Sequence, residues 1–216
     1  MTSIESRTGN IVNLLMAIGH CCSDMNQGAL SAVLPFLIAQ HHYGYATASA
    51  LVMASNIVGS VVQPAFGHIA DRFNRPMLIG LGLLLACTGM AMVGVMPGFA
   101  GLVAAVIVSG VGVAMFHPQA ARLVNKASTR SRAAGNVALF SFGGNVGFAL
   151  GPVLVTATVG AWGLPGMLAF AIPGLAMMII IAVMNGLLHD IGKTSIVDTR
   201  LTNGNEAPTE RWKTSK

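Results

Sequence analysis

Asp24 and His20 are the two residues of this sequence whose types and spacing most clearly permit chemistry. They lie four residues apart within an apolar stretch, so a helix would place both side chains on one face. An ionised carboxylate in such surroundings costs several kcal/mol or is neutralised by a proton, and a histidine changes charge near neutral pH. The pair can therefore bind and release one proton. A static hydrogen-bonded pair that fixes helix packing is the alternative.

The same pair has the spacing of half a metal site. A complete site needs further ligands from a facing helix, and no other apolar segment contributes a carboxylate. We therefore expect no metal at this position, and the sequence predicts no cofactor.

The composition indicates that the main solvent of this chain is lipid. Hydrophobic residues make up 54% of the 216 residues and charged residues 9%, whereas soluble domains carry about 25% charged residues. A soluble enzyme or a nucleic-acid-binding protein is excluded on this ground, despite the formal net charge of +5. The three cysteines lie in apolar stretches without a CxxC pair, so we expect them to be small core residues.

Six apolar segments reach the ~20 residues that a helix needs to cross a membrane. They cover residues 11–40, 46–70, 77–96, 99–124, 134–160 and 164–188. Strands of a membrane barrel would be about 10 residues long with strict alternation, so these segments predict an all-α membrane protein. We assign residues 1–10 to a cytoplasmic N-terminus, 11–189 to a six-helix transmembrane domain and 190–216 to a cytoplasmic disordered tail or linker.

The basic residues set the orientation of this six-helix arrangement. All twelve Lys and Arg residues fall before the first segment, around the second and fourth connections, or in the tail. These regions share one side of the membrane, and an excess of basic residues marks the cytoplasmic side. We expect a multi-pass protein of the inner (plasma) membrane with both termini in the cytoplasm.

Polar side chains are concentrated in four of the six segments. The third and sixth segments are nearly free of them and are expected to face lipid. Two polar segments followed by an apolar one, twice over, predict a three-plus-three inverted repeat, which in transporters surrounds a substrate site near mid-membrane. Polar groups that only join helices together are the alternative. The candidate cavity residues are Asn26, Gln27, Asn56, His117, Gln119, Ser141 and Asn145.

The connection between the second and third segments reads Gly67-His68-Ile69-Ala70-Asp71-Arg72-Phe73-Asn74-Arg75-Pro76. It resembles the signature loop of the major facilitator superfamily, G-x-x-x-D-R-x-G-R-R/K. Gly67, Asp71, Arg72 and Arg75 match, while Asn74 and Pro76 replace a glycine and a basic residue. The resemblance implies a six-helix half of the major facilitator fold, in which this loop takes part in conformational gating.

Three further stretches resemble the fosmidomycin-resistance family of efflux transporters. They are residues 19–28 with Leu34-Pro35-Phe36, residues 116–122, and residues 140–147 running into Gly151-Pro152. The resemblance implies proton-coupled efflux of drugs or metabolites. Because Asp24 is the one acid within the six apolar segments, we expect Asp24 and His20 to be the proton-coupling pair. Gly147-x-x-x-Gly151-Pro152 also resembles the core of an antiporter motif, and Pro118 would kink its helix, so these four residues are candidates for gating.

Twelve-helix members of the superfamily carry two six-helix halves, and this sequence matches one of them. Its expected partners are a second six-helix half or a second copy of the chain, a small-molecule substrate, protons and the bilayer, with no nucleic acid. The alternatives are a non-transporting remnant or membrane interaction module, and an uptake symporter. An intramembrane protease would need G-x-S-G, and Ser109-Gly110 lacks its first glycine.

Overall fold

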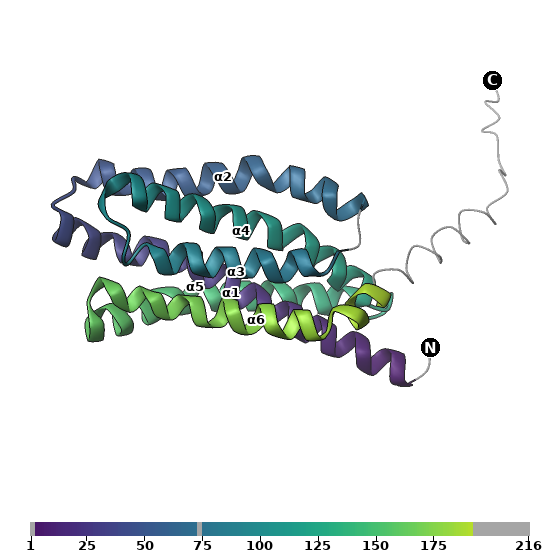
Figure 1. The fold of residues 1–216 in the computed structure, drawn as a ribbon. Helices are drawn as coiled ribbons and strands as arrows, with labels where there is room; N and C mark the ends of the chain where they lie inside the picture. The colour runs from purple at the N-terminus through teal and green to yellow at the C-terminus, as the bar shows by residue number, and fades with distance from the viewer. Residues whose placement is uncertain (1–2, 73–74, 192–216) are drawn as a thin grey trace, which may run out of the picture.

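The computed structural model describes residues 3–72 and 75–191, and all regular secondary structure in these two ranges is helical. In chain order the elements are α1 (Ser3–His41), α2 (Tyr45–Arg72), α3 (Met77–Met92), α4 (Gly98–Ala127), α5 (Ala133–Trp162), the 3-10 helix η1 (Leu164–Phe170) and α6 (Ala171–Val183) (Figure 1). The prediction of an all-helical fold is confirmed.

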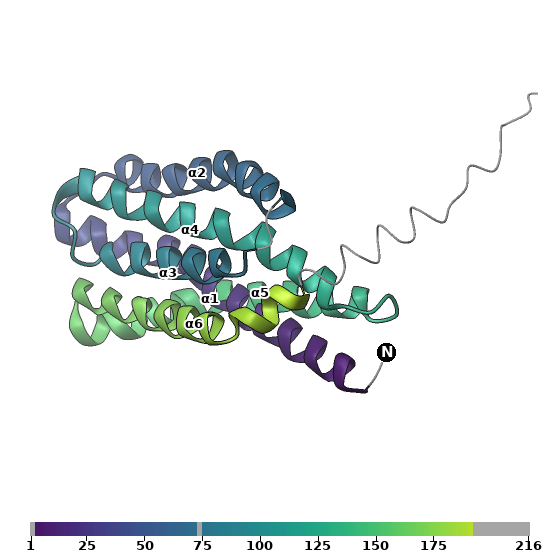
Figure 2. The same ribbon diagram turned by 45° about the vertical axis from the view of Figure 1, so that its right-hand side comes forward.

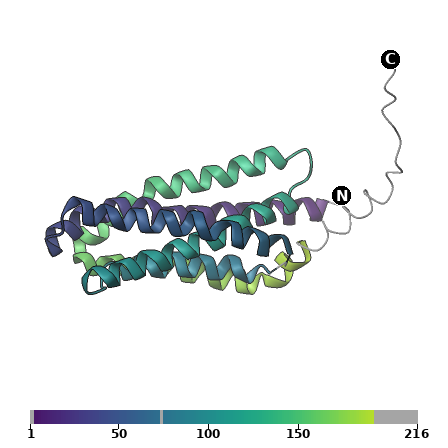
Figure 3. The same ribbon diagram turned by 90° about the horizontal axis from the view of Figure 1, so that it is seen from above.

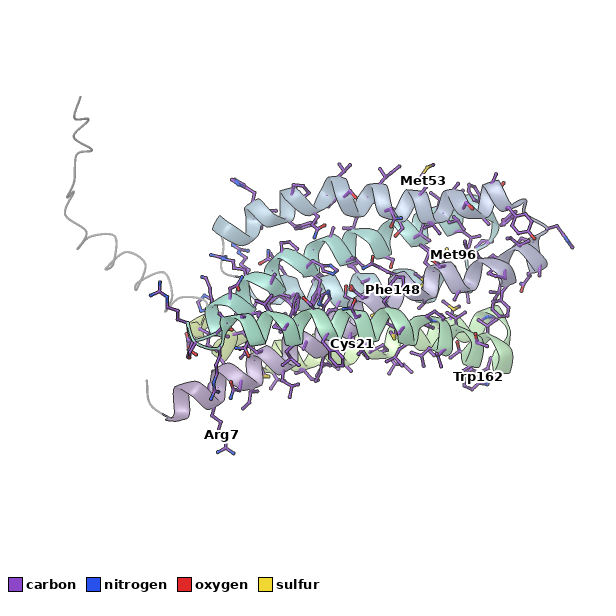
Figure 4. All side chains as sticks on the ribbon, turned by 180° about the vertical axis from the view of Figure 1, so that it is seen from behind. Arg7, Cys21, Met53, Met96, Phe148 and Trp162 are labelled. Atoms are coloured by element: carbon purple, nitrogen blue, oxygen red, sulfur yellow. The ribbon has the colours of Figure 1, made fainter. Side chains whose placement is uncertain are left out.

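The helices run up and down along one bundle axis. The start of α1, the α2–α3 connection and the α4–α5 connection lie at one end of the bundle, and the other connections lie at the opposite end (Figure 1). Figures 1 and 2 show α2 lying over α4 along one edge, with α6 along the opposite edge. Arg7 and Trp162 mark the two ends (Figure 4).

Helix boundaries differ from the predicted segments at both ends of the chain. α1 begins at Ser3 instead of residue 11, so part of the expected N-terminal region is helical. The last predicted segment, 164–188, is divided into η1 and α6, and a turn at Met184 interrupts the helix again. Pro165 lies in the first residues of η1, where its missing N–H breaks no intrahelical hydrogen bond.

Four helical stretches among the described residues are long and apolar enough to cross a membrane by themselves. They are Tyr45–Ile69, Gly98–Ala127, Ala133–Trp162 and Leu164–Val183. α3 has 16 residues and falls short of this length. α1 is long, but its middle carries His20, Asp24 and Gln27, which lower its hydropathy.

α1 and α5 approach each other closely because glycines line their contact. Gly143, Gly147 and Gly151 are four residues apart, so they lie on one face of α5. A Cβ atom at any of them would collide with the backbone of α1. The carbonyl oxygens that they approach belong to Ala17, Cys21 and Met25. Figure 3 shows α5 beside α1 at one side of the bundle.

α3 and α6, which were both expected to face lipid, differ in how far their side chains are exposed. α6 exposes large apolar side chains, namely Ile172, Leu175, Ile179, Ile180 and Val183. α3 exposes only Leu81 among its large apolar residues, because α4 and α6 cover most of it. Gly82 and Gly89 bring its backbone against α4. The expectation for α3 was wrong because it was based on the lack of polar side chains. It did not take into account the glycines through which α3 packs against α4.

The buried apolar residues form two clusters along the bundle axis. In α1 the first cluster includes Val12 and Met16, and the second begins at Met25 and extends to Leu37. His20 and Asp24 lie between the two clusters. The fold thus places the candidate pair at mid-length of the helices, where the sequence analysis expected it.

Candidate functional site

Asp24 forms a three-residue cluster with His20 of α1 and His117 of α4. His20 Nε2 lies 3.1 Å from Asp24 Oδ2, and His117 Nε2 lies 3.1 Å from Asp24 Oδ1. The two Nε2 atoms are also 3.1 Å apart. We call these three residues the HDH cluster. The sequence predicted the contact between His20 and Asp24, and the fold adds His117.

The other ring nitrogen of each histidine faces a backbone carbonyl. His20 Nδ1 lies 2.8 Å from the Phe140 oxygen, and His117 Nδ1 lies 2.8 Å from the Val113 oxygen. A carbonyl oxygen only accepts hydrogen bonds, so each Nδ1 must carry the hydrogen. In a neutral ring this leaves Nε2 without a hydrogen, and both bare Nε2 atoms therefore point at each other and at the carboxylate.

One shared proton would relieve the electrostatic repulsion within this arrangement. With both rings neutral and Asp24 ionised, two bare Nε2 atoms and a carboxylate lie close together. All of them are hydrogen-bond acceptors, and the cluster has a net charge of −1. One added proton on either Nε2 atom forms a charge-assisted hydrogen bond to Asp24 and makes the cluster neutral overall.

The surroundings of the HDH cluster are mostly apolar. The side chains of His20, Asp24 and His117 are 11%, 18% and 20% exposed. The Phe140 ring stacks on His20, with 4.1 Å between the ring centroids. Gly144 of α5 leaves room for the cluster, since a Cβ atom there would lie 2.7 Å from Asp24 Oδ2 and His20 Nε2.

A polar cavity of about 280 Å³ borders the cluster. It lies at mid-length of α1, α2 and α4, and His117 belongs to its wall. Gln27 connects the cavity with the cluster because its amide donates to Asp24 Oδ1 over 3.0 Å. The residues that line the cavity are Gln27, Ser55, Asn56, Gly59, Ser60, Gln63, Gly110, Val113 and His117. A small polar molecule in this space would contact amides, hydroxyls and one member of the cluster.

The seven residues predicted to line a cavity are distributed over several places. Gln27, Asn56 and His117 line the polar cavity. Asn26 is buried and donates to the Cys22 oxygen over 2.8 Å. Gln119 is also buried and lies beside Arg75 and Arg122 in a separate, smaller pocket.

Ser141 and Asn145 lie on an exposed part of α5. They come three residues before and one residue after Gly144, whose position touches the HDH cluster. At about 100° per residue, both lie on the same side of α5, next to Gly144 on the helix surface. They therefore flank the cluster without belonging to the wall of the polar cavity.

The predicted gating residues fall into three groups. Gly67 of α2 faces Pro118 of α4, and a Cβ atom at Gly67 would lie 4.0 Å from the Pro118 side chain. Gly147, Gly151 and Pro152 belong to the contact between α5 and α1.

The signature loop forms the third group. Asp71 and Arg72 end α2, with side chains outside the described ones, and residues 73–74 lie outside the described ranges, as does the predicted tail from residue 192 onward. Arg75 is exposed and borders the pocket that contains Gln119.

The residue types that suggested other chemistry have packing roles in this fold. The Ser109 hydroxyl is buried and donates to the Ala86 oxygen over 2.9 Å, so it joins α4 to α3. The three cysteines are free thiols, and Cys87 is buried beside Asn26.

Comparison with known proteins gives the family of the chain. The sequence profile of the Major Facilitator Superfamily matches residues 16–213. The fosmidomycin resistance protein of Escherichia coli (strain K12) is 22% identical over 181 residues, which cover 84% of this chain and 44% of that protein. The uncharacterized MFS-type transporter YfnC of Bacillus subtilis (strain 168) is 28% identical over 146 residues, which cover 68% of this chain and 35% of that protein.

A solved structure agrees with this assignment at the level of the fold. It is that of a bacterial homolog to the human lysosomal transporter Spinster, in an inward-facing and unoccupied conformation. The TM-score is 0.68 at 16% identity, over 82% of this chain and 42% of that chain. This chain thus spans less than half the length of the relatives it matches. Because the family profile matches most of the sequence, the chain belongs to the Major Facilitator Superfamily of membrane transporters, which are not enzymes.

Proposed function

We propose that this protein transports small organic solutes across the inner membrane by exchange for protons, as one half of a twelve-helix unit. The observation that carries the proposal is the HDH cluster at the wall of a polar cavity, at mid-length of the helices. One cation-binding centre beside one solute-sized space is the minimum that exchange between a proton and a solute requires.

The coupling follows from the charge of the cluster. In a dry, closed state the neutral cluster is favoured, because a net charge of −1 in low dielectric is costly. Hydration from the cytoplasmic side stabilises the ionised carboxylate and allows the proton to leave. Solute and proton then use the same polar region in turn, and the proton gradient drives solute export.

Fosmidomycin-like compounds are the proposed substrates. The proposal rests on the similarity to the Escherichia coli fosmidomycin resistance protein. It is supported by the amides and hydroxyls of Gln27, Ser55 and Asn56, which offer both hydrogen-bond donors and acceptors to a polar solute.

The helix contacts support six membrane crossings in a three-plus-three repeat. If α1, α2 and α3 correspond to α4, α5 and α6, the α1–α5 contact corresponds to the contact between α4 and α2. Both contacts are extensive in this bundle, and α3 packs on its own counterpart α6. An inverted repeat of this kind places its site between the two sets of helices, where the HDH cluster lies.

A second six-helix half, or a second copy of this chain, is the proposed partner. Among the described residues, the polar cavity is lined by α1, α2 and α4, and a second half would supply its remaining wall. α2 and α5 also expose large apolar side chains at mid-length, among them Ile57 and Phe148. A non-transporting remnant would leave the cavity without this wall.

Labelling of single cysteines in intact cells tests the proposed orientation. In a background without native cysteines, a thiol reagent that does not cross membranes should react at Tyr43→Cys and not at Arg130→Cys. Position 43 lies in the first connection, whereas position 130 lies between α4 and α5 at the opposite end of the bundle. Reaction at position 130 with none at position 43 would show that the orientation is the reverse of the proposed one.

Transport by the purified chain in vesicles tests the function. With an imposed pH gradient, vesicles that contain the chain should move radiolabelled fosmidomycin against its concentration gradient, and protein-free vesicles should not. Collapse of the pH gradient by a protonophore should stop the accumulation. Fluxes equal to those of protein-free vesicles, from a chain that cross-linking shows to be paired with a second copy, would support the remnant instead. The same result from an unpaired chain would indicate that a separate second half is needed.

A further inference from the structure

The HDH cluster presents three atoms of the kinds that transition metals prefer. The Nε2 atoms of His20 and His117 and a carboxylate oxygen of Asp24 meet at one point, and the ligand atoms of these residues all lie within 4.8 Å of one another. We propose that the cluster is a binding site for a divalent transition-metal ion such as Zn²⁺.

The spacing of the three atoms fits one face of a zinc coordination tetrahedron. Zinc lies about 2.0–2.1 Å from nitrogen and oxygen ligands, which places tetrahedral ligands about 3.3–3.4 Å from each other. The two Nε2 atoms are 3.1 Å apart, His20 Nε2 lies 3.1 Å from Asp24 Oδ2, and His117 Nε2 lies 3.1 Å from Asp24 Oδ1. An ion could therefore bind both carboxylate oxygens, or a rotation of the carboxylate could bring one oxygen to it.

The histidines are oriented in the manner of metal ligands. In metal sites the non-ligating ring N–H usually donates to a carbonyl or carboxylate, which fixes the tautomer and directs the other nitrogen at the ion. Here the Nδ1 atoms of His20 and His117 face the Phe140 and Val113 carbonyls. Asp24 is held in turn by the Gln27 amide. Both the ligands and the groups that orient them are thus present.

The fourth coordination position would face the polar cavity. His117 contributes both to the cluster and to the cavity wall, so water can complete the tetrahedron from that side. Two imidazoles with one carboxylate favour Zn²⁺, Ni²⁺ or Cu²⁺ over Mg²⁺ and Ca²⁺, which prefer oxygen ligands. This site was not expected from the sequence, because the other apolar segments carry no carboxylate. Its third ligand is a histidine, His117.

Zinc and the proton exclude each other at these atoms. A bound ion needs bare Nε2 atoms and an ionised carboxylate, so protonation of the cluster weakens its affinity for metal. Few other ionisable groups act on the site. On α1 Cys21 interacts electrostatically with Asp24, and α5 contains no ionisable residue. The ionisable residues of α2 lie near its two ends, those of α4 other than His117 lie toward its C-terminal end, and α3 carries Cys87. Zinc binding would inhibit transport, and this consequence rests on the proposed function. The binding of zinc itself does not depend on that function.

Titration of the full chain in mild detergent with Zn²⁺ tests the binding. We expect one saturable Zn²⁺ per chain at pH 7.5. His117→Gln and Asp24→Asn should each weaken binding at least about tenfold, as loss of groups in zinc sites does. His117→Cys supplies a thiolate and should restore it. Co²⁺ should give the intense visible absorption of tetrahedral coordination in the wild type.

The matched control replaces histidines away from the cluster. A His41→Gln, His42→Gln, His68→Gln triple variant should bind Zn²⁺ as the wild type does, and thermal unfolding of each variant confirms that it is folded. Absence of saturable binding, or binding that the triple variant loses and His117→Gln keeps, would overturn the proposal. Binding by a chain that transports nothing would uphold the site and contradict only the proposed function.

Discussion

Replacement of Asp24 by Asn is expected to abolish uphill solute transport while leaving downhill exchange of solute. An amide cannot take up the coupling proton. The change in charge of the HDH cluster that links solute flux to proton flux is therefore lost. The amide still fits the site, because its oxygen can accept hydrogen bonds from Gln27 and from a protonated histidine. Accumulation of labelled fosmidomycin in vesicles with a pH gradient should fall to the level of protein-free vesicles.

Asp190→Asn is the matched control for this experiment. Asp190 is 80% exposed and lies beyond α6, far from the HDH cluster in the fold. Its variant should accumulate solute as the wild type does. If Asp24→Asn accumulated solute against its gradient, the coupling proton would be carried elsewhere, and His117 would be the next residue to replace.

Substitution of Gly147 is expected to lower the stability of the helix bundle strongly. A Cβ atom at this position would collide with the Cys21 carbonyl of α1, and helix backbones yield less readily than side chains. Overpacking of a close contact costs about 1–3 kcal/mol. Gly147→Ala should therefore lower the midpoint of thermal unfolding by at least about 2 °C, and Gly147→Val should lower it further.

Gly160 provides a control on the same helix. It has no atom within 4 Å of its added Cβ, so Gly160→Ala changes helix propensity without changing a contact. Its unfolding midpoint should equal or exceed that of the wild type. Equal midpoints for Gly147→Ala and Gly160→Ala would show that α1 and α5 do not pack through the glycine face.

The sequence was informative where a feature depends on one helix. The His20–Asp24 contact follows from a spacing of four, and the glycine repeat of α5 follows from the same rule. The separation into apolar helices was also predictable, because crossing hydrocarbon imposes length and composition on each segment. Helix ends were less so, since α1 continues to Ser3 without an apolar sequence to mark it.

Features that depend on two helices could not be derived in the same way. His117 joins Asp24 because α1 and α4 pack in one particular rotation, and no spacing within either helix encodes it. The same reason separates Asn26 from Gln27. These neighbours differ by about 100° around the helix, so Asn26 turns to Cys87 of α3 and Gln27 to the cavity.

Solute-dependent proton movement tests the central claim most directly. Vesicles that contain the chain, an internal pH-sensitive dye and no initial pH gradient are given an outward-directed or inward-directed gradient of fosmidomycin. Exchange at the HDH cluster predicts that the internal pH rises when solute enters the vesicles and falls when solute leaves them. Asp24→Asn should abolish this pH change while solute still flows. Solute flow with no change of internal pH in the wild type would contradict the account.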